Sequence, residues 1–160
     1  MTPHIRRATS ADADRAAVIT RAAYSPWVPV IGREPAPMSA DHAALAREGA
    51  LWIADDDDGR SVGVLVLRAE PDHLLVQSVA VDPDAQRSGV GRALLAFAEQ
   101  HALEAGLPEL RLYTHERMTT NIALYERLGY RITRRAEQDG FARVHLAKRV
   151  QAKSASGADE

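Results

Sequence analysis

The chain has 160 residues, a formal net charge of −2 and no cysteine. This length suits one domain with a substantial core, and the charge gives no overall basic field that would attract nucleic acid. The absence of cysteine excludes disulfides, thiolate zinc sites and a cysteine nucleophile. No apolar signal region opens the chain, and no run of about 18 apolar residues occurs in it. We therefore expect a soluble, cytoplasmic protein that does not bind a membrane.

The residue pattern predicts a single domain over residues 1–150, followed by a disordered polar tail over 151–160. Thr9 or Ser10 can cap the first helix, and Gly49 ends the second. The expected elements of the first part are a strand over 4–8, helices over 11–24 and 39–49, and a hairpin of strands over 51–54 and 61–68.

The segment from Tyr24 to Met38 contains four prolines and one glycine, which predicts an irregular loop. It nevertheless keeps aromatic and branched side chains, and such a loop usually packs against something. Two interpretations stay open, a packed loop that covers the core and a wall of a substrate site. In the second, Tyr24, Trp27 and Ile31 bind the substrate.

Residues 74–81 are rich in Leu and Val and predict a well-buried strand, which Pro83 ends because it has no N–H to give to a ladder. Gly89 and Gly91 follow, and an apolar run then predicts a helix over 89–105. The first N–H groups of a helix have no partner inside it, and the helix dipole adds partial positive charge there. This order of strand, glycine turn and helix predicts a phosphate site, flanked by the cations Arg87 and Arg92.

Other phosphate loops fit this stretch less well. A dinucleotide fingerprint needs a third glycine where Leu94 stands, and a Walker loop needs Lys and Ser or Thr where Arg92 and Ala93 stand. A plain strand-to-helix turn with no ligand is the remaining alternative.

The last part of the chain is expected to hold a strand over 109–113, a helix over 120–129, and a hairpin of strands over 130–133 and 141–148 around the turn 137–140. Asp55 to Asp58 are four successive aspartates, but they lack the EF-hand spacing and belong to a turn. The histidines are scattered without paired spacing. We therefore expect no metal site.

Gln86-x-x-Gly89-x-Gly91, placed after the strand, closely resembles the pyrophosphate motif Q/R-x-x-G-x-G/A of the GCN5-related N-acetyltransferase (GNAT) family. The resemblance implies an α/β (α+β) fold with a mixed, mostly antiparallel sheet of six to seven strands and helices on both faces. It also implies that acetyl-CoA is the cosubstrate. The residues assigned to it are Val79, Ala80, Val81, Gln86, Arg87, Ser88, Gly89, Val90, Gly91 and Arg92.

Asn121, Tyr125 and Gly129-Tyr130 are similar to the second motif of that family, N-x-x-A-x-x-x-Y-x-x-x-G-F/Y, shortened by one turn. The resemblance implies that Asn121 contacts the pantetheine arm. It also implies that Tyr125 lies near the thioester sulfur and protonates the leaving thiolate. The alternatives are a helix N-cap for Asn121 and a core aromatic for Tyr125.

Many relatives in the family carry an acid where this chain has Gln77, which cannot act as a base. The stretch Thr114-His115-Glu116 resembles one found at the end of the fifth strand in small family members. We therefore expect Glu116 to be the general base, directly or through a water, with His115 behind it. The alternative is an exposed acid at a strand end.

The predicted activity is N-acetyl transfer from acetyl-CoA to a primary amine, expected on a small molecule, by direct attack in a ternary complex. Three alternatives are kept: an acyl-CoA-binding or sensing module without catalysis, an acetyltransferase for a protein amine, and a nucleotide-binding domain. The expected partners are acetyl-CoA and the amine, without nucleic acid, and a homodimer is left open.

Overall fold

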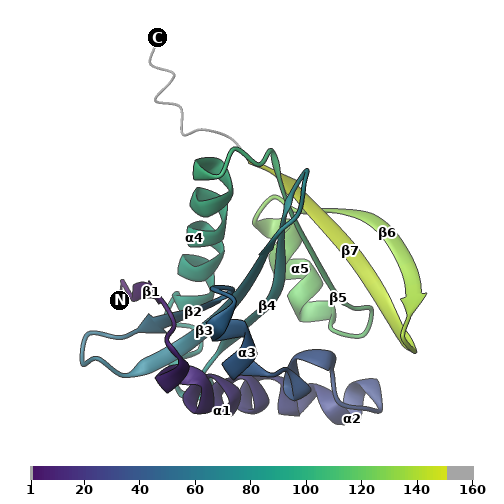
Figure 1. Cartoon of the computed structure of the whole chain (residues 1–160). Helices are drawn as coiled ribbons and strands as arrows, with labels where there is room; N and C mark the ends of the chain where they lie inside the picture. Colours follow the sequence, from purple (N-terminus) through teal and green to yellow (C-terminus); the bar gives the residue numbers. More distant parts are fainter. Residues whose placement is uncertain (1, 151–160) are drawn as a thin grey trace. The chain divides into compact units, whose positions relative to one another are not determined.

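The computed structural model describes residues 2–150, so the predicted tail over 151–160 lies outside the described residues. Seven strands form a mostly antiparallel sheet and helices accompany it (Figure 1), as predicted for the fold class. The chain divides into two compact units, one with residues up to Arg68 and Val76–Phe97, the other with Ala69–Leu75 and the chain from Ala98 onward. The single domain over 1–150 stays a prediction. Within residues 2–150, no helix has the length and apolar character needed to cross a membrane.

The strands of the first unit follow the sequence order β1-β2-β3-β4, and β4 begins in the second unit. The β1–β2 and β2–β3 pairs are antiparallel. The predicted strand over 4–8, the hairpin over 51–54 and 61–68, and the strand over 74–81 are all present. Their bounds are β1 (His4–Arg7), β2 (Leu51–Asp55), β3 (Ser61–Ala69) and β4 (Leu74–Val81).

Two helices cover one face of this part of the sheet, α1 (Ala13–Tyr24) and α3 (His42–Arg47). A cluster of buried apolar side chains joins them to the strands, with Ile19 of α1, Leu45 of α3 and Val64 of β3 each almost fully buried. Burying such side chains is the main favourable contribution to folding.

The proline-rich segment after α1 is helical, which corrects the predicted irregular loop. It forms a 3₁₀ turn (Ser25–Trp27), the short helix α2 (Val28–Ile31) and a second 3₁₀ turn (Ala36–Ser39). Each of these carries a proline in its first two positions. Proline is tolerated there because a first-turn N–H would have no helical partner in any case.

The opposite face of β3 receives the first turns of α4 (Val90–Glu104). A Cβ atom built on Gly63 would lie 2.9 Å from a Val90 methyl group and 3.0 Å from a Leu94 methyl group. The missing side chain therefore gives α4 the space to pack directly on the sheet. Helices lie on both faces of the first unit, as predicted.

The second unit contains β5 (Glu109–His115), α5 (Thr119–Arg127), β6 (Arg131–Gln138) and β7 (Phe141–Arg149). Its strands lie in the order β5-β7-β6 and both pairs are antiparallel. Asp139 and Gly140 form the β6–β7 turn with positive φ values of 53° and 81°, as an Asp-Gly hairpin turn requires. β6 continues well beyond the predicted range 130–133, because its pairing with β7 reaches the turn.

We expect Gly63→Ala to lower the free energy of unfolding by about 1–3 kcal/mol, since the added methyl group would overpack the contact with α4. Gly91→Ala is the matched control. A Cβ there would lie 3.6 Å from Val81, an ordinary contact, and Ala favours a helix over Gly. Urea denaturation of both variants measures the difference. A Gly63→Ala protein as stable as Gly91→Ala would contradict this account of the packing.

Candidate functional site

The end of β4 is fixed by one acidic side chain. Asp82 accepts a hydrogen bond from the backbone N–H of Asp84 at 3.0 Å, which closes the turn after the strand. The guanidinium of Arg15, on α1, donates to the other Asp82 oxygen at 2.7 Å and to the carbonyl of Ser61 at 3.1 Å. The turn thus starts from a point tied to both α1 and β3.

The predicted phosphate turn has the backbone that its glycine suggests. Gly89 has a φ of 92° and Arg87 a φ of 68°, both in the left-handed region. The N–H of Ala93 donates to the carbonyl of Gly89 at 3.0 Å, so the N–H groups between these residues precede the helical ladder. Such a helix start can bind an anion. Gln86, at the beginning of the turn, donates its amide to the Val81 carbonyl at 3.4 Å.

One hydrogen bond brings the predicted substrate segment to the predicted cofactor strand. The hydroxyl of Tyr24, at the end of α1, donates to the carbonyl of Val79 at 3.3 Å. Trp27 and Ile31 follow in the next two helical turns, and both are half-buried. Partial exposure of all three side chains is consistent with either interpretation of the segment.

Asn121 and Tyr125 lie one turn apart on α5, in the second unit. Met118 occupies the N-cap position and Asn121 is the third helical residue, so the alternative N-cap interpretation of Asn121 is wrong. The Tyr125 side chain is buried, with its ring centroid 5.8 Å from that of Tyr130. Tyr125 therefore contributes to the core, as the alternative of a core aromatic predicts. Its catalytic role stays a prediction.

The predicted base lies just after β5. Glu116 is exposed, and its backbone N–H donates to the Ala142 carbonyl at 2.9 Å. The N–H of Arg117 donates to Nδ1 of His115 at 3.0 Å, which leaves the proton of the neutral ring on Nε2. Burial lowers the pKa of His115 below its ordinary 6.5, while Glu116 raises it and Arg117 lowers it. His115 is therefore predominantly neutral at pH 7, with its Nε2–H as a hydrogen-bond donor.

Gln77 and the first two of the four successive aspartates make structural contacts. The Gln77 side-chain oxygen accepts a hydrogen bond from Arg68 at 3.1 Å. Asp55 pairs with Arg6 at 2.8 Å, and Asp56 accepts two backbone N–H groups of its own turn at 2.9 Å. Among residues 2–150, no three His, Asp or Glu side chains gather in a way that could hold a metal ion.

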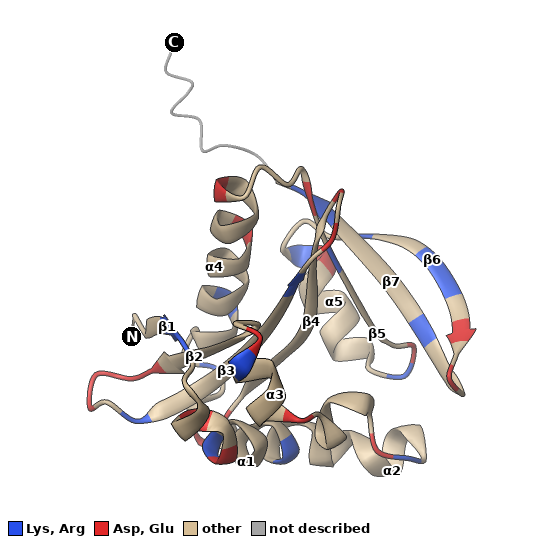
Figure 2. Cartoon of the chain, in the orientation of Figure 1, with Lys and Arg blue, Asp and Glu red and all other residues tan. Residues whose placement is uncertain are grey.

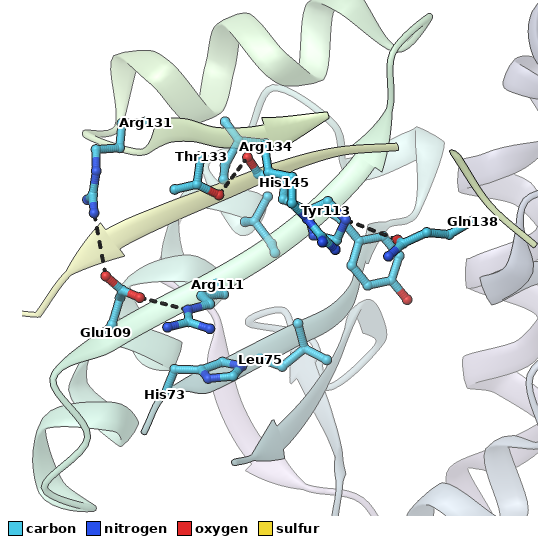
Figure 3. Close-up of a pocket in the computed structure, with 12 residues that line it drawn as sticks. His73, Leu75, Glu109, Arg111, Tyr113, Arg131, Thr133, Arg134, Gln138 and His145 are labelled. Carbon is cyan, nitrogen blue, oxygen red and sulfur yellow. Dashed lines mark hydrogen bonds and ion pairs between the residues drawn. The ribbon is translucent and has the colours of Figure 1, made fainter. Parts of the chain in front are cut away.

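A basic pocket that the sequence analysis did not predict lies in the second unit (Figure 3). Its volume is about 800 Å³, within the range of small-molecule sites. The sequence indicates this pocket only by the three arginines within residues 131–135. It does not show which of them share a face of the sheet. Its polar lining includes Arg111, Tyr113, Arg131, Arg134, Gln138 and His145.

Comparison with known proteins gives three similarities. Residues 17–130 match the Acetyltransferase (GNAT) family. The chain is 32% identical to S-(2-succino)cysteine N-acetyltransferase of Bacillus subtilis (strain 168), over 94% of this chain and 98% of that protein. It is 30% identical to peptidyl-lysine N-acetyltransferase YjaB of Escherichia coli (strain K12), over 61% of this chain and 60% of that one.

The fold also has a near neighbour among solved structures. The crystal structure of PaiA N-acetyltransferase from Thermoplasma acidophilum in complex with coenzyme A superposes with a TM-score of 0.78 at 19% identity. The superposition covers 93% of this chain and 99% of that one. At this level of identity the likeness shows the fold.

The family match and the end-to-end similarity to a named N-acetyltransferase identify the class of the protein as an acyltransferase. The chain belongs to the Acetyltransferase (GNAT) family. It is an N-acetyltransferase, and the predicted family, fold class and enzyme class are confirmed.

We expect the pKa of His115 to lie below 6.5 and to move in opposite directions in two variants. Glu116→Gln removes a negative charge that favours the imidazolium form, so the pKa falls further. Arg117→Gln removes a positive charge, so the pKa rises. NMR titration of the His115 ring protons measures both shifts. An unchanged pKa in Glu116→Gln would separate that carboxylate from the imidazole and remove His115 from the proposed base.

Proposed function

We propose that this enzyme transfers the acetyl group of acetyl-CoA to the primary amine of a small molecule, in a ternary complex without a covalent enzyme intermediate. The observation that carries the proposal is the turn formed by Arg87 and Gly89 at the start of α4, which presents backbone N–H groups to an anion. The small acceptor is supported by the B. subtilis relative, which matches almost end to end and is named for a small amine.

In this proposal the pyrophosphate of acetyl-CoA binds the N–H groups of residues 89–92, and Arg87 and Arg92 add positive charge. The remaining cofactor residues, including Gln86, Ser88 and the strand end Val79–Val81, shape the turn and the thioester site. Asn121 hydrogen-bonds the pantetheine arm. These roles follow the family resemblance and the local geometry of each segment.

An ammonium group cannot attack a thioester, so the acceptor must first lose a proton. Glu116 takes this proton directly or through a water, with the neutral His115 beside it in the chain. The neutral amine attacks the thioester carbon, a C–N bond forms, and a backbone N–H at the end of β4 stabilises the oxyanion. The attacking nitrogen, now positively charged, loses its second proton to water. The C–S bond breaks, Tyr125 gives a proton to the leaving thiolate, and the Tyr125 hydroxyl is then reprotonated from solvent.

The acceptor body is proposed to contact Tyr24, Trp27 and Ile31, which the Tyr24–Val79 hydrogen bond brings to the strand end. A protein amine is the second candidate, because YjaB is named a peptidyl-lysine acetyltransferase. That match covers about three-fifths of each chain, less than the B. subtilis match covers. A cytoplasmic location and a homodimer stay predictions, as does the absence of metal, nucleic-acid and membrane partners.

We expect Gly89→Ala to weaken binding of coenzyme A by about tenfold or more, because a Cβ strains the left-handed turn that aims the N–H groups. Gly91→Ala adds the same methyl group without this strain and should bind nearly as wild type does. Isothermal titration calorimetry measures both affinities, with circular dichroism as a check of folding. Equal affinities in the two variants would place the pyrophosphate elsewhere.

Tyr125→Phe should lower kcat by about 10²-fold or more and leave the affinity for acetyl-CoA nearly unchanged, since general-acid assistance is typically worth about 10²–10⁴. Thiol release from acetyl-CoA with a panel of small amines and lysine peptides measures turnover. If kcat stays within a few-fold of wild type, Tyr125 is a packing residue. Acetylation of the peptides with none of the small amines would favour the second candidate function.

A further inference from the structure

One face of the sheet formed by β5, β7 and β6 carries polar side chains in cross-strand rows (Figure 3). Alternation along β5 buries Leu110 and Leu112 on one face and turns Arg111 and Tyr113 to the other. Tyr113 pairs with His145 of β7, and His145 pairs with Arg134 of β6. These three side chains form the central row of the pocket.

A β-bulge places Arg134 in this row. The register passes from Ile132, opposite Leu146, directly to Arg134, opposite His145, so Thr133 is the extra residue. The Thr133 hydroxyl donates to the His145 carbonyl at 3.3 Å, which fixes the bulge. In a regular strand Thr133 alone would face the pocket and Arg134 would point to the opposite face, whereas with the bulge both residues line the pocket.

The pocket has an excess of positive charge. Its lining holds three arginines and one glutamate, a formal charge of +2 with the histidines counted as neutral. Glu109 pairs with Arg111 at 2.7 Å and with Arg131 at 3.6 Å, so these two cations are partly neutralised. Arg134 has no carboxylate within 4.0 Å in the described part of the chain. Figure 2 shows the basic segments along β6 and β7.

The groups around Arg134 are polar without supplying a counter-charge. Nε2 of His145 lies 3.0 Å from the side-chain oxygen of Gln138, which can only accept a hydrogen bond. Burial lowers the pKa of His145, and the positive charges of Arg134 and Arg143 lower it further. The neutral imidazole therefore donates to Gln138, and Arg134, an exposed side chain at the pocket wall, has no carboxylate partner among residues 2–150.

The same face continues toward the proposed base. Arg143 of β7 lies with its guanidinium 4.4 Å from the Tyr113 ring centroid and 5.6 Å from that of Phe141. The Phe141 ring is in turn 6.3 Å from the His115 ring. His115 is on the same face of β5 as Tyr113, two residues further on. The pocket therefore shares a sheet face with His115, and an acceptor that reaches from Arg134 to the proposed base has to pass over Arg143 and Phe141.

We propose that this pocket binds a carboxylate of the acceptor amine, with Arg134 as its principal ligand, so that the substrates are anionic amines of amino-acid size. A guanidinium binds a carboxylate in bidentate geometry, and the lining disfavours polycationic acceptors by like-charge repulsion. The inference rests on the proposed function, because it names the substrate class of the same reaction.

Kinetics with two acceptors of equal size test the proposal. S-carboxymethylcysteine carries two carboxylates, and S-carbamoylmethylcysteine amide carries none. We expect Arg134→Gln to raise the KM for the first by about 10- to 100-fold and to change the KM for the second less than threefold. The KM for acetyl-CoA should not change. Arg135→Gln is the matched control, since Arg135 pairs with Val144, which is buried on the opposite face.

Two outcomes overturn the inference while the proposed function stands. In one, Arg134→Gln changes both acceptors equally or neither. In the other, the neutral acceptor or a lysine peptide is the better substrate of the wild-type enzyme. If the wild type releases no thiol with any amine, the proposed function fails. In that case, isothermal titration calorimetry with N-acetyl-S-carboxymethylcysteine in the presence of coenzyme A tests whether the pocket binds a carboxylate. Arg134→Gln must then weaken this binding, and Arg135→Gln must leave it unchanged.

Discussion

The direct contact between β3 and α4 is the constraint on which the proposed cofactor turn depends. Gly63 has no side chain at the point where Val90 and Leu94 cross the sheet, so the first turns of the helix lie directly on the strand. The residues of the turn, Arg87 to Gly89, immediately precede this contact in the chain. A helix held further from β3 would move the N–H groups at its start away from the end of β4. Core packing and the position of these N–H groups are therefore set by the same contact.

This turn could be predicted from the sequence because all of its determinants are local. Pro83 stops a strand, Gly89 permits a left-handed backbone, and an apolar run starts a helix, each within a few residues of the others. The strand over 74–81 and the helix after the turn have nearly the predicted bounds. The proline-rich segment 25–39 was harder, since proline is equally at home in loops and in the first turn of a helix. Its helical form depends on packing that the sequence pattern does not display.

The basic pocket could not be predicted for a different reason. A strand's alternation tells which side chains share a face, but a bulge reverses the alternation beyond it. In β6, the bulge at Thr133 puts Arg131 and Arg134 on one face and Arg135 on the other. A regular pattern would have grouped Arg131 with Arg135 instead. The position of the bulge is a property of the pairing between β6 and β7. The alternation pattern along β6 alone does not contain it.

Net charge was equally uninformative about the acceptor. A chain with a formal charge of −2 has no long-range field that favours an anionic substrate. What matters for recognition is the local arrangement of charges, because the attraction between a guanidinium and a carboxylate acts at short range and solvent screens it at longer distances. Glu109 neutralises much of Arg111 and Arg131, which leaves Arg134 as the group whose charge a ligand would have to satisfy. Because burial, and then the charges of Arg134 and Arg143, depress the pKa of His145, that imidazole adds a hydrogen bond to Gln138 without adding charge.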